Sequence, residues 1–208
     1  METTTIDGSL GLTGRLRARK FRTHSTAPLG WKLSNTLRWS YLRGELAWRI
    51  GRPIAKALGL VSVVGELRAV LNRRDGTTVD YGLLGRRSVT TAFCAFAVDQ
   101  LQTETSVWGD FKFHDSGVGT TAENVADTDM ETTDGESRAT GTQTETSNVV
   151  YSSVGTISYT TTKAITEHGL FNASTGVTLL DRTVFSAINV VNGDSIQFTY
   201  TLTFTAGG

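Results

Sequence analysis

The chain has 208 residues, of which 38% are hydrophobic and 19% charged, so it can bury a core and is neither a disordered polymer nor a membrane bundle. Its basic and acidic residues cancel overall, but residues 1–87 (16 basic, 6 acidic) carry a net charge of +10 and residues 88–208 (4 basic, 14 acidic) one of −10. One cysteine excludes an internal disulfide framework, three histidines leave little for a zinc site, and no apolar run approaches the ~18 residues of a membrane span.

The first predicted unit is a basic N-terminal arm, residues 1–57. The block GRLRARKFR contains five cations, Arg15, Arg17, Arg19, Lys20 and Arg22. Because these cations repel one another, we expect the block to stay extended until it binds an acidic surface or a neighbouring chain. From residue 31 to residue 58, large apolar residues recur mostly at three- and four-residue spacing. This pattern predicts an amphipathic helix, which Pro53 ends or kinks.

Three tryptophans of the arm complete the candidate interface: Trp31, Trp39 and Trp48. They add more apolar surface than so short a segment can bury alone, so we expect the arm to pack on another subunit or domain rather than to fold back on its own chain. A basic helix with tryptophans also suits nucleic acid or a membrane surface. The segment has no nucleic-acid recognition module, and arginines on several faces interrupt the apolar half that a membrane requires. Protein partners are therefore favoured, with nucleic acid as a weaker alternative and no membrane.

After residue 58 the pattern becomes that of strands, which predicts a β domain over residues 58–208. Short strands are expected at 60–64, 66–71 and 78–84, with a hairpin turn at 74–76. Residues 89–101 are the most apolar run, and periodicity alone does not separate a buried strand from a short helix. Cys94 lies within this run without a histidine or a charged neighbour, so we expect a buried packing residue rather than a reactive thiol.

The C-terminal segment 195–205 has the clearest strand pattern in the chain. Its apolar residues alternate with Gln and Thr, which predicts one buried face formed by Ile196, Phe198, Tyr200, Leu202 and Phe204 and one exposed face. The preceding Asn-Gly-Asp at 192–194 predicts a hairpin with a strand over 183–191. Further strands are expected at 108–113, 148–161, 164–171 and 178–180. The predicted fold is mainly β, an antiparallel β-sandwich or jelly roll preceded by the partly helical arm.

Residues 115–148 predict a long acidic loop within the β domain, since they contain almost no large apolar side chain. Asp127, Asp129 and Glu131 have a spacing that can converge on Ca²⁺. However, Thr132 and Arg138 stand where an EF-hand loop has its glycine and its closing glutamate. A solvated loop, or one that receives a basic arm, is therefore favoured over a calcium site.

No set of residues predicts an enzyme. Glu167 and His168 are neighbours in a predicted strand, so their side chains point to opposite faces and cannot act on one substrate. No phosphate-binding loop and no nucleophile motif accompanies them. We expect His168, His114 and Asp115 to be hydrogen-bonded sheet residues, and we expect no catalytic residue, no cofactor and no metal.

Five runs of sequence carry a resemblance to a known group: DYG at 80–82 with RRSVTT at 86–91, HDSGVGTTAE at 114–123, ESRATGTQ at 136–143, AITEHGLF at 164–171 and LDRTVFSAINVVNGDSIQFTY at 180–200. With these runs the chain resembles small structural proteins of tailed bacteriophages, from about residue 58 to its end. The run at 165–171 is also similar to a strand–turn motif of tail-collar and tail-fibre proteins. The basic arm lies outside the resemblance.

The resemblance implies a non-enzymatic virion component, assembled in the bacterial cytoplasm as part of a symmetric array with other virion proteins. Three positions in the particle compete. A capsid decoration (cement) protein that holds neighbouring subunits through its arm is favoured. A tail, collar or neck subunit is the first alternative, and an arm-type capsid protein that contacts packaged nucleic acid is the second.

Overall fold

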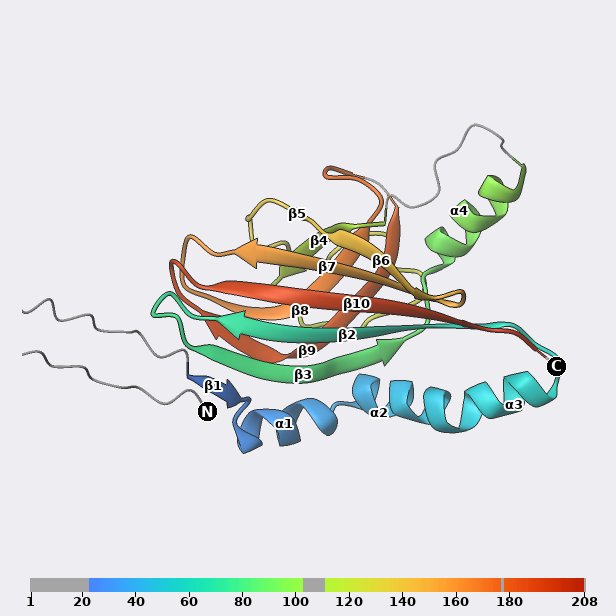
Figure 1. Cartoon of the computed structure of the whole chain (residues 1–208), viewed down its shortest axis with the longest axis horizontal. Helices are drawn as coiled ribbons and strands as arrows, with labels where there is room; N and C mark the ends of the chain where they lie inside the picture. The colour runs from blue at the N-terminus through green and yellow to red at the C-terminus, as the bar shows by residue number, and fades with distance from the viewer. Residues whose placement is uncertain (1–22, 103–110, 177, 208) are drawn as a thin grey trace, which may run out of the picture.

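A computed structural model describes residues 23–102, 111–176 and 178–207, and its strands form two sheets (Figure 1). The six-stranded sheet has the order β1 (His24–Thr26), β3 (Thr78–Arg87), β2 (Ser62–Asn72), β10 (Ser195–Thr205), β7 (Val150–Ser158), β6 (Thr142–Ser147). The four-stranded sheet has the order β5 (Ala139–Thr140), β4 (Phe113–Gly117), β8 (Lys163–Phe171), β9 (Leu179–Val190). The helices are α1 (Leu29–Thr36), α2 (Trp39–Leu46), a π-helical turn (Ala47–Gly51), α3 (Arg52–Ala57) and α4 (Thr91–Gln102).

The two sheets share one hydrophobic core. Leu67 of β2 and Phe198 of β10 belong to the same buried cluster as Ile165 of β8 and Phe185 of β9. Strand β10 lies at the centre of the six-stranded sheet, paired with β2 on one side and β7 on the other. The prediction of a mainly β fold is confirmed, whereas the finer description as a jelly roll stays a prediction.

Strand β10 confirms most of the alternation predicted at the C-terminus. Its inward residues from Ile196 to Leu202 are at most 3% exposed. The prediction is wrong for Phe204, which is 39% exposed, because it lies beyond the last residue pair between β10 and β7 and has a strand partner only in β2. Thr199, Thr201 and Thr203 are half-buried rather than exposed, since neighbouring strands flank them on both sides.

The two predicted turns have different outcomes. The turn at 74–76 joins β2 to β3 as predicted, and its Gly76 has a φ of 89°, a conformation that favours glycine. The turn at 192–194 also forms, but the hairpin prediction is wrong, because β9 and β10 belong to different sheets. The carboxylate of Asp194 accepts hydrogen bonds from Arg73 and from the backbone of Arg74. This tie to the β2–β3 turn fixes the point where the chain crosses between sheets.

The ambiguous run at 89–101 is helix α4. Its Phe93 is buried and contacts Phe111 edge to face, as Phe96 does. Cys94 is exposed, so the prediction of a buried thiol is wrong: one residue further along a helix points about 100° away from Phe93. Residues 108–110 of a predicted strand lie outside the described residues.

Other predicted segments differ in their limits. The segments at 60–64 and 66–71 form one strand, β2, and those at 178–180 and 183–191 form one strand, β9. The predicted loop at 115–148 is too long, because β4 extends to Gly117 and β5 and β6 occupy most of 139–147. The irregular stretch is therefore residues 118–138.

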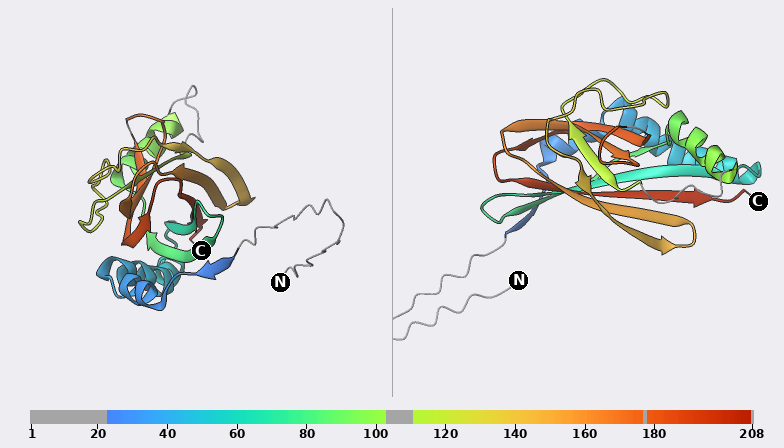
Figure 2. Two further views of the ribbon diagram at one scale, coloured as in Figure 1. Left: turned by 90° about the vertical axis from the view of Figure 1, so that its left-hand side faces the viewer. Right: turned by 90° about the horizontal axis from the view of Figure 1, so that it is seen from above.

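Residues 24–57 lie against the side of the two sheets (Figure 2). Strand β1 pairs in parallel with β3, and α1 and α2 follow along β9 and β3. The prediction that this segment packs on another subunit is thus wrong for its inner side, and the boundary at residues 57/58 stays a prediction.

Pro53 does not end the helix: a π-helical turn precedes it and α3 continues through it. Such a turn accommodates the hydrogen bond that proline lacks.

Candidate functional site

The inner side of α1 is polar and seals the seam between the two sheets. Asn35 is buried, and its side-chain amide donates to the carbonyl of Leu84 in β3 (2.9 Å) while its oxygen accepts from the N–H of Ser186 in β9 (3.0 Å). The indole N–H of Trp31 donates to the carbonyls of Ser186 and Ala187 (2.9 and 3.0 Å). These bonds satisfy backbone groups at the edges of both sheets, which would otherwise be open to strand pairing.

The inner side of α2 is also polar. A Cβ atom at Gly44 would overlap the carbonyl oxygen of Arg86 in β3, so glycine permits the close approach of helix and strand. Glu45 forms an ion pair with Arg86, which pairs in turn with Glu66 of β2 (2.6 Å). The Trp48 ring lies 5.0 Å from the Arg86 guanidinium. Helix α2 is therefore held by charge and close backbone contact rather than by an apolar stripe.

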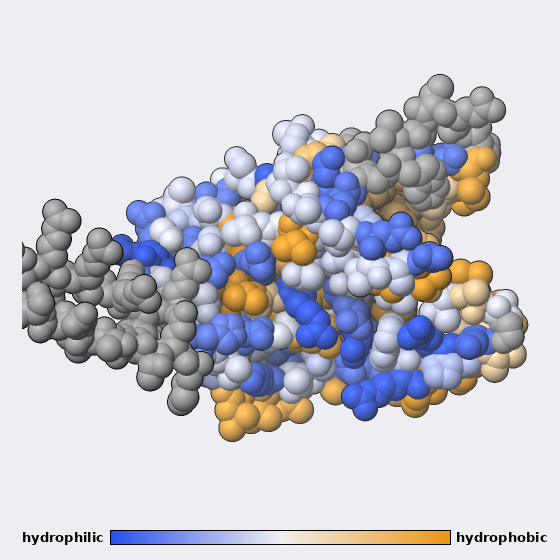
Figure 3. Space-filling view, in the orientation of Figure 1, coloured by the Kyte–Doolittle hydropathy of each residue, from blue (hydrophilic) through white to orange (hydrophobic). Residues whose placement is uncertain are grey.

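Apart from Trp31, Tyr41 and Trp48, the large apolar residues from α1 to α3 face outward. We call this surface the apolar helix face; its members are 45–74% exposed and are Leu29, Leu33, Leu37, Trp39, Leu42, Leu46, Ile50 and Ile54. A surface helix normally turns its apolar stripe toward the core, so this run has the reverse arrangement. Figure 3 shows apolar atoms along the lower edge of the molecule, over this run. With a rise of 1.5 Å per residue the face is about 40 Å long, and about 10 Å wide, a size that marks interaction sites.

Unpaired cations border the apolar helix face. Among the described residues, no carboxylate lies within ion-pair distance of Lys32, Arg38, Arg43 or Lys56. Glu45, the sole acidic residue between positions 29 and 58, is engaged by Arg86 and Arg49. The face therefore combines an apolar centre with a positive border.

The acidic stretch 118–138 is neutralised within its own chain. Arg182 of β9 forms ion pairs with Asp127 (3.0 Å), Glu131 (3.2 Å) and the buried Glu167 (2.6 Å). Glu167 also accepts hydrogen bonds from the backbone N–H groups of Gly119, Glu131 and Thr132. Two of the three carboxylates considered for Ca²⁺ thus bind the Arg182 guanidinium, and the third, Asp129, lies 3.8 Å from Arg138. Within the described part of the chain, no three His, Cys, Asp or Glu side chains are placed to hold a metal ion.

Two further ion pairs fasten the same stretch. Arg138 binds Asp115 of β4 (2.9 Å) and Lys163 of β8 binds Glu136 (2.8 Å). The hydrogen bond from Lys163 lowers the pKa of Glu136 to about 2. These carboxylates are therefore engaged in ion pairs within the same chain. The five cations predicted to seek an acidic surface, at positions 15–22, lie outside the described residues.

The histidines of the sheets are buried and bonded, as predicted. His114 Nδ1 lies 2.9 Å from His168 Nε2, and His114 Nε2 lies 2.9 Å from the hydroxyl of Ser153. Burial lowers the pKa of His114 to about 4 and that of His168 well below its usual value. Glu167 points to the opposite side, toward Arg182. The strand therefore separates these neighbours, and solvent does not reach either imidazole.

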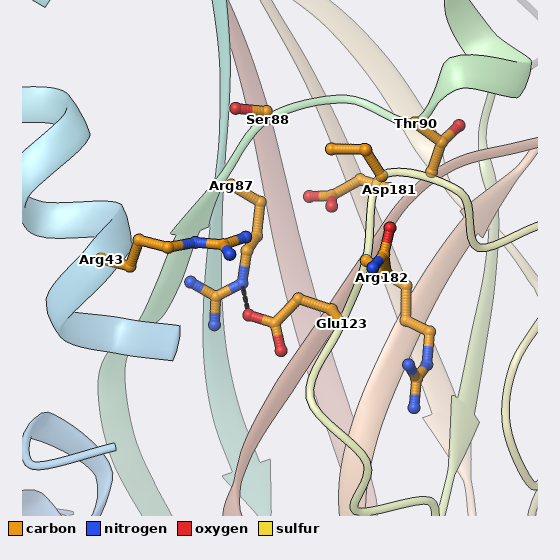
Figure 4. Close-up of a pocket in the computed structure, with 9 residues that line it drawn as sticks. Arg43, Arg87, Ser88, Thr90, Glu123, Asp181 and Arg182 are labelled. Carbon is orange, nitrogen blue, oxygen red and sulfur yellow. Dashed lines mark ion pairs between the residues drawn. The ribbon is translucent and has the colours of Figure 1, made fainter. Parts of the chain in front are cut away.

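A small cavity lies where α2, β3, β9 and the acidic stretch meet (Figure 4). Arg87 forms a buried ion pair with Glu123 beside it, and Asp181 points toward Arg87. Burial raises the pKa of Asp181 to about 7. The cavity volume is about 30 Å³, which suits one water molecule rather than a substrate. Sequence reasoning missed this cluster, because its members come from distant segments with no shared motif.

Of the predicted interface tryptophans, the structure places one on the outer surface. Trp39 is 74% exposed, whereas Trp31 contacts Tyr81 edge to face at 4.7 Å and Trp48 lies against arginine side chains. The apolar repeat was visible in the sequence, but the side it faces was not. A signal in the sequence that points to the outward orientation of the leucines is the set of small or polar residues on the opposite side of the helices, Ser34, Asn35 and Gly44.

The comparisons with known proteins add no relative: no protein-family model, curated protein or solved structure matches this chain. Among the described helices, none combines the length and apolar character needed to cross a bilayer.

Proposed function

We propose that this chain is a non-enzymatic structural component of a tailed-phage virion, a capsid decoration protein that docks on a neighbouring subunit through the apolar helix face. The observation that carries the proposal is the reversed orientation of α1–α3. Their polar sides seal the sheets, and their leucines face outward. Leaving this face in water is costly, at about 25 cal/mol per Å² of apolar surface. A partner that covers it recovers this free energy.

The resemblance to phage structural proteins supports the proposal from a different part of the molecule. Its runs fall on the strand framework, including all but the first residue of β8 and of β9. The apolar helix face lies outside those runs. A shared sandwich framework with its own attachment surface is what a decoration protein needs.

The ionisable side chains that are buried among the described residues support a role without catalysis. His114 and His168 are sealed between the sheets, and the cavity beside Arg87 holds no more than a small solvent molecule. Glu167 and Asp115 are bound to arginines of the same chain. These groups stabilise the fold and do not meet a substrate.

The test is incorporation into particles. The double substitution Leu42→Ser/Leu46→Ser removes two side chains from the centre of the apolar helix face. We expect a folded protein that purified virions lack, measured by quantitative blotting of gradient-purified particles. Leu101→Ser is the matched control, because Leu101 is 82% exposed on α4 and lies away from the face.

Cryo-electron microscopy of the particles then locates the protein. We expect density on the head shell that is lost in the double variant. Density on the collar or tail would replace the decoration role by a tail or neck role. Complete absence of the wild-type chain from virions would refute the proposal.

A further inference from the structure

We infer that the apolar helix face binds a different protein with an acidic border around an apolar groove, rather than a second copy of this chain. The inference rests on the proposed function, since it names the partner of the same surface. It follows from the charges that border the face and from the state of the carboxylates elsewhere in the molecule.

The border cations are placed to meet a partner at the same time as the leucines. Lys32 adjoins Leu33 and Arg43 adjoins Leu42 in the sequence, and all four side chains are exposed. The Arg43 side chain also lines the cavity beside Arg87 (Figure 4), so it lies on the border of the face nearest β3. Neighbouring residues on a helix point about 100° apart, so a groove that covers the apolar stripe brings its rims to the cations. Carboxylates on those rims form charge-assisted hydrogen bonds, and they steer the encounter of the two proteins.

Self-association through this face is opposed by charge. In a two-fold contact the same surface occurs on both sides, so Lys32, Arg38, Arg43 and Lys56 of each copy meet those of the other. Neither copy contributes a free carboxylate from α1–α3, because Glu45 is bound to Arg86 and Arg49. Like charges opposed across an interface disfavour a wrong partner.

A head-to-tail contact between copies is opposed as well. The concentrated acidic charge of the chain lies in residues 118–138, and its carboxylates are held by Arg182, Arg138 and Lys163 of the same molecule. To bind the border cations of another copy, the carboxylates paired with Arg182 and Lys163 would have to weaken these pairs; Asp129, whose side chain is 66% exposed, is the exception. An acidic surface on a different protein has no such cost.

The shape of the face favours a protein groove over a flat anionic membrane. Arg38 has an extended backbone (φ −63°, ψ 134°) between α1 and α2, and this breaks the helix within the apolar face. The leucine spacing changes there from four residues to five, between Leu37 and Leu42. Trp39 lies at the break and is 74% exposed, a suitable anchor for a pocket in the partner.

Two synthetic helical peptides test the inference with the intact chain. Both carry leucines at four-residue spacing; one has glutamates on both flanks of the stripe and the other has lysines. In fluorescence anisotropy at about 50 mM salt, we expect the glutamate peptide to bind on the order of tenfold more tightly. At about 300 mM salt the difference should shrink, because screening weakens exposed ion pairs.

Variants assign the effect to this surface. Lys32→Ser/Arg43→Ser should weaken binding of the glutamate peptide several-fold and should strengthen, not weaken, binding of the lysine peptide, because it removes like charges. Arg74→Ser is the matched control, because Arg74 is an exposed cation in the β2–β3 turn. Leu42→Ser/Leu46→Ser should abolish binding of both peptides.

Equal affinity for the two peptides, or binding of neither peptide, would overturn the inference. A dimer in light scattering that the substitutions Leu42→Ser/Leu46→Ser dissociate would overturn it in favour of self-association. Sedimentation of the chain with phosphatidylglycerol vesicles but not with phosphatidylcholine vesicles would overturn it in favour of a membrane. Failure of the proposed function is a separate outcome. A chain that enters virions without preferring the glutamate peptide refutes the acidic partner alone. A chain that prefers this peptide but is absent from virions refutes the virion role alone.

Discussion

Helix α1 leads to an unusual prediction about stability: removing a polar residue should destabilise the protein more than removing a leucine from the same helix. In Asn35→Ala, the buried N–H of Ser186 and the carbonyl of Leu84 both lose their partner. A buried polar group left unpaired costs about 1–3 kcal/mol, so two such groups give a loss of about 2–6 kcal/mol.

Leu33→Ser is the matched substitution on the outer side of α1. Leu33 is 52% exposed, so its removal creates no cavity in the core. The expected loss combines the difference in helix propensity with the apolar area that the half-covered side chain buries, about 1 kcal/mol in all. In an ordinary amphipathic helix the order of the two effects would be the reverse.

Urea unfolding of the intact chain, followed by circular dichroism and tryptophan fluorescence, measures both variants. We expect the midpoint of Asn35→Ala to fall by on the order of 1–2 M, since m-values are about 1–3 kcal/mol per M. The midpoint of Leu33→Ser should stay within a few tenths of a molar unit of wild type. If Leu33→Ser is the more destabilised variant, α1 packs through its leucines and the reversed orientation is wrong.

Three further predictions concern the core and pH. Phe198→Ala should cost about 3–5 kcal/mol, because Phe198 is fully buried against Phe185 and His168; an unchanged urea midpoint would contradict the register of β10. Burial lowers the pKa of His114 to about 4 in the folded protein, whereas its pKa is about 6.5 in the unfolded chain. The unfolded state therefore binds the proton first, and the free energy of unfolding falls by about 3 kcal/mol as pH drops from 6.5 to 4. His114→Gln should lose correspondingly less between pH 7.5 and 4.5, and equal losses would count against the buried imidazole. Asp181 acts in the opposite sense, because burial raises its folded pKa from 3.8 to about 7. Its contribution to stability is full below about pH 4 and is lost as pH rises from about 4 to 7. Asp181→Asn should therefore remove this part of the pH dependence of the unfolding free energy, and an unchanged profile between about pH 4 and 7 would exclude this role.

Local pattern was sufficient where one segment carries all the information about its own conformation. The alternation in residues 195–205 predicts β10 and the buried side of Phe198, because successive side chains of a strand point to opposite faces. The glycine at position 76 predicts a tight turn between β2 and β3. The expectation that His114, Asp115 and His168 are bonded sheet residues also follows from their position in strands, and the structure confirms it.

Pattern failed where a distant segment decides between two conformations that are equally acceptable locally. The turn at 192–194 is compatible with a hairpin, but the tie from Asp194 to the β2–β3 turn directs the chain into the other sheet. The apolar run at 89–101 buries Phe93 as a helix, and this choice leaves Cys94 outside. No partner for the carboxylates of residues 118–138 could be recognised from the sequence, because their cations are distant in the chain. Arg182, which binds Glu131 and Asp127, lies 51 and 55 residues away from them, respectively.

The orientation of α1–α3 separates the two kinds of information most clearly. The sequence by itself determined that residues 31–58 are helical and amphipathic, because the apolar spacing is a local property. Which side faces the protein was decided only by the tertiary structure. Asn35 meets backbone groups 49 and 151 residues away, and leaving those groups unpaired costs more than exposing leucines at a surface that a partner can cover.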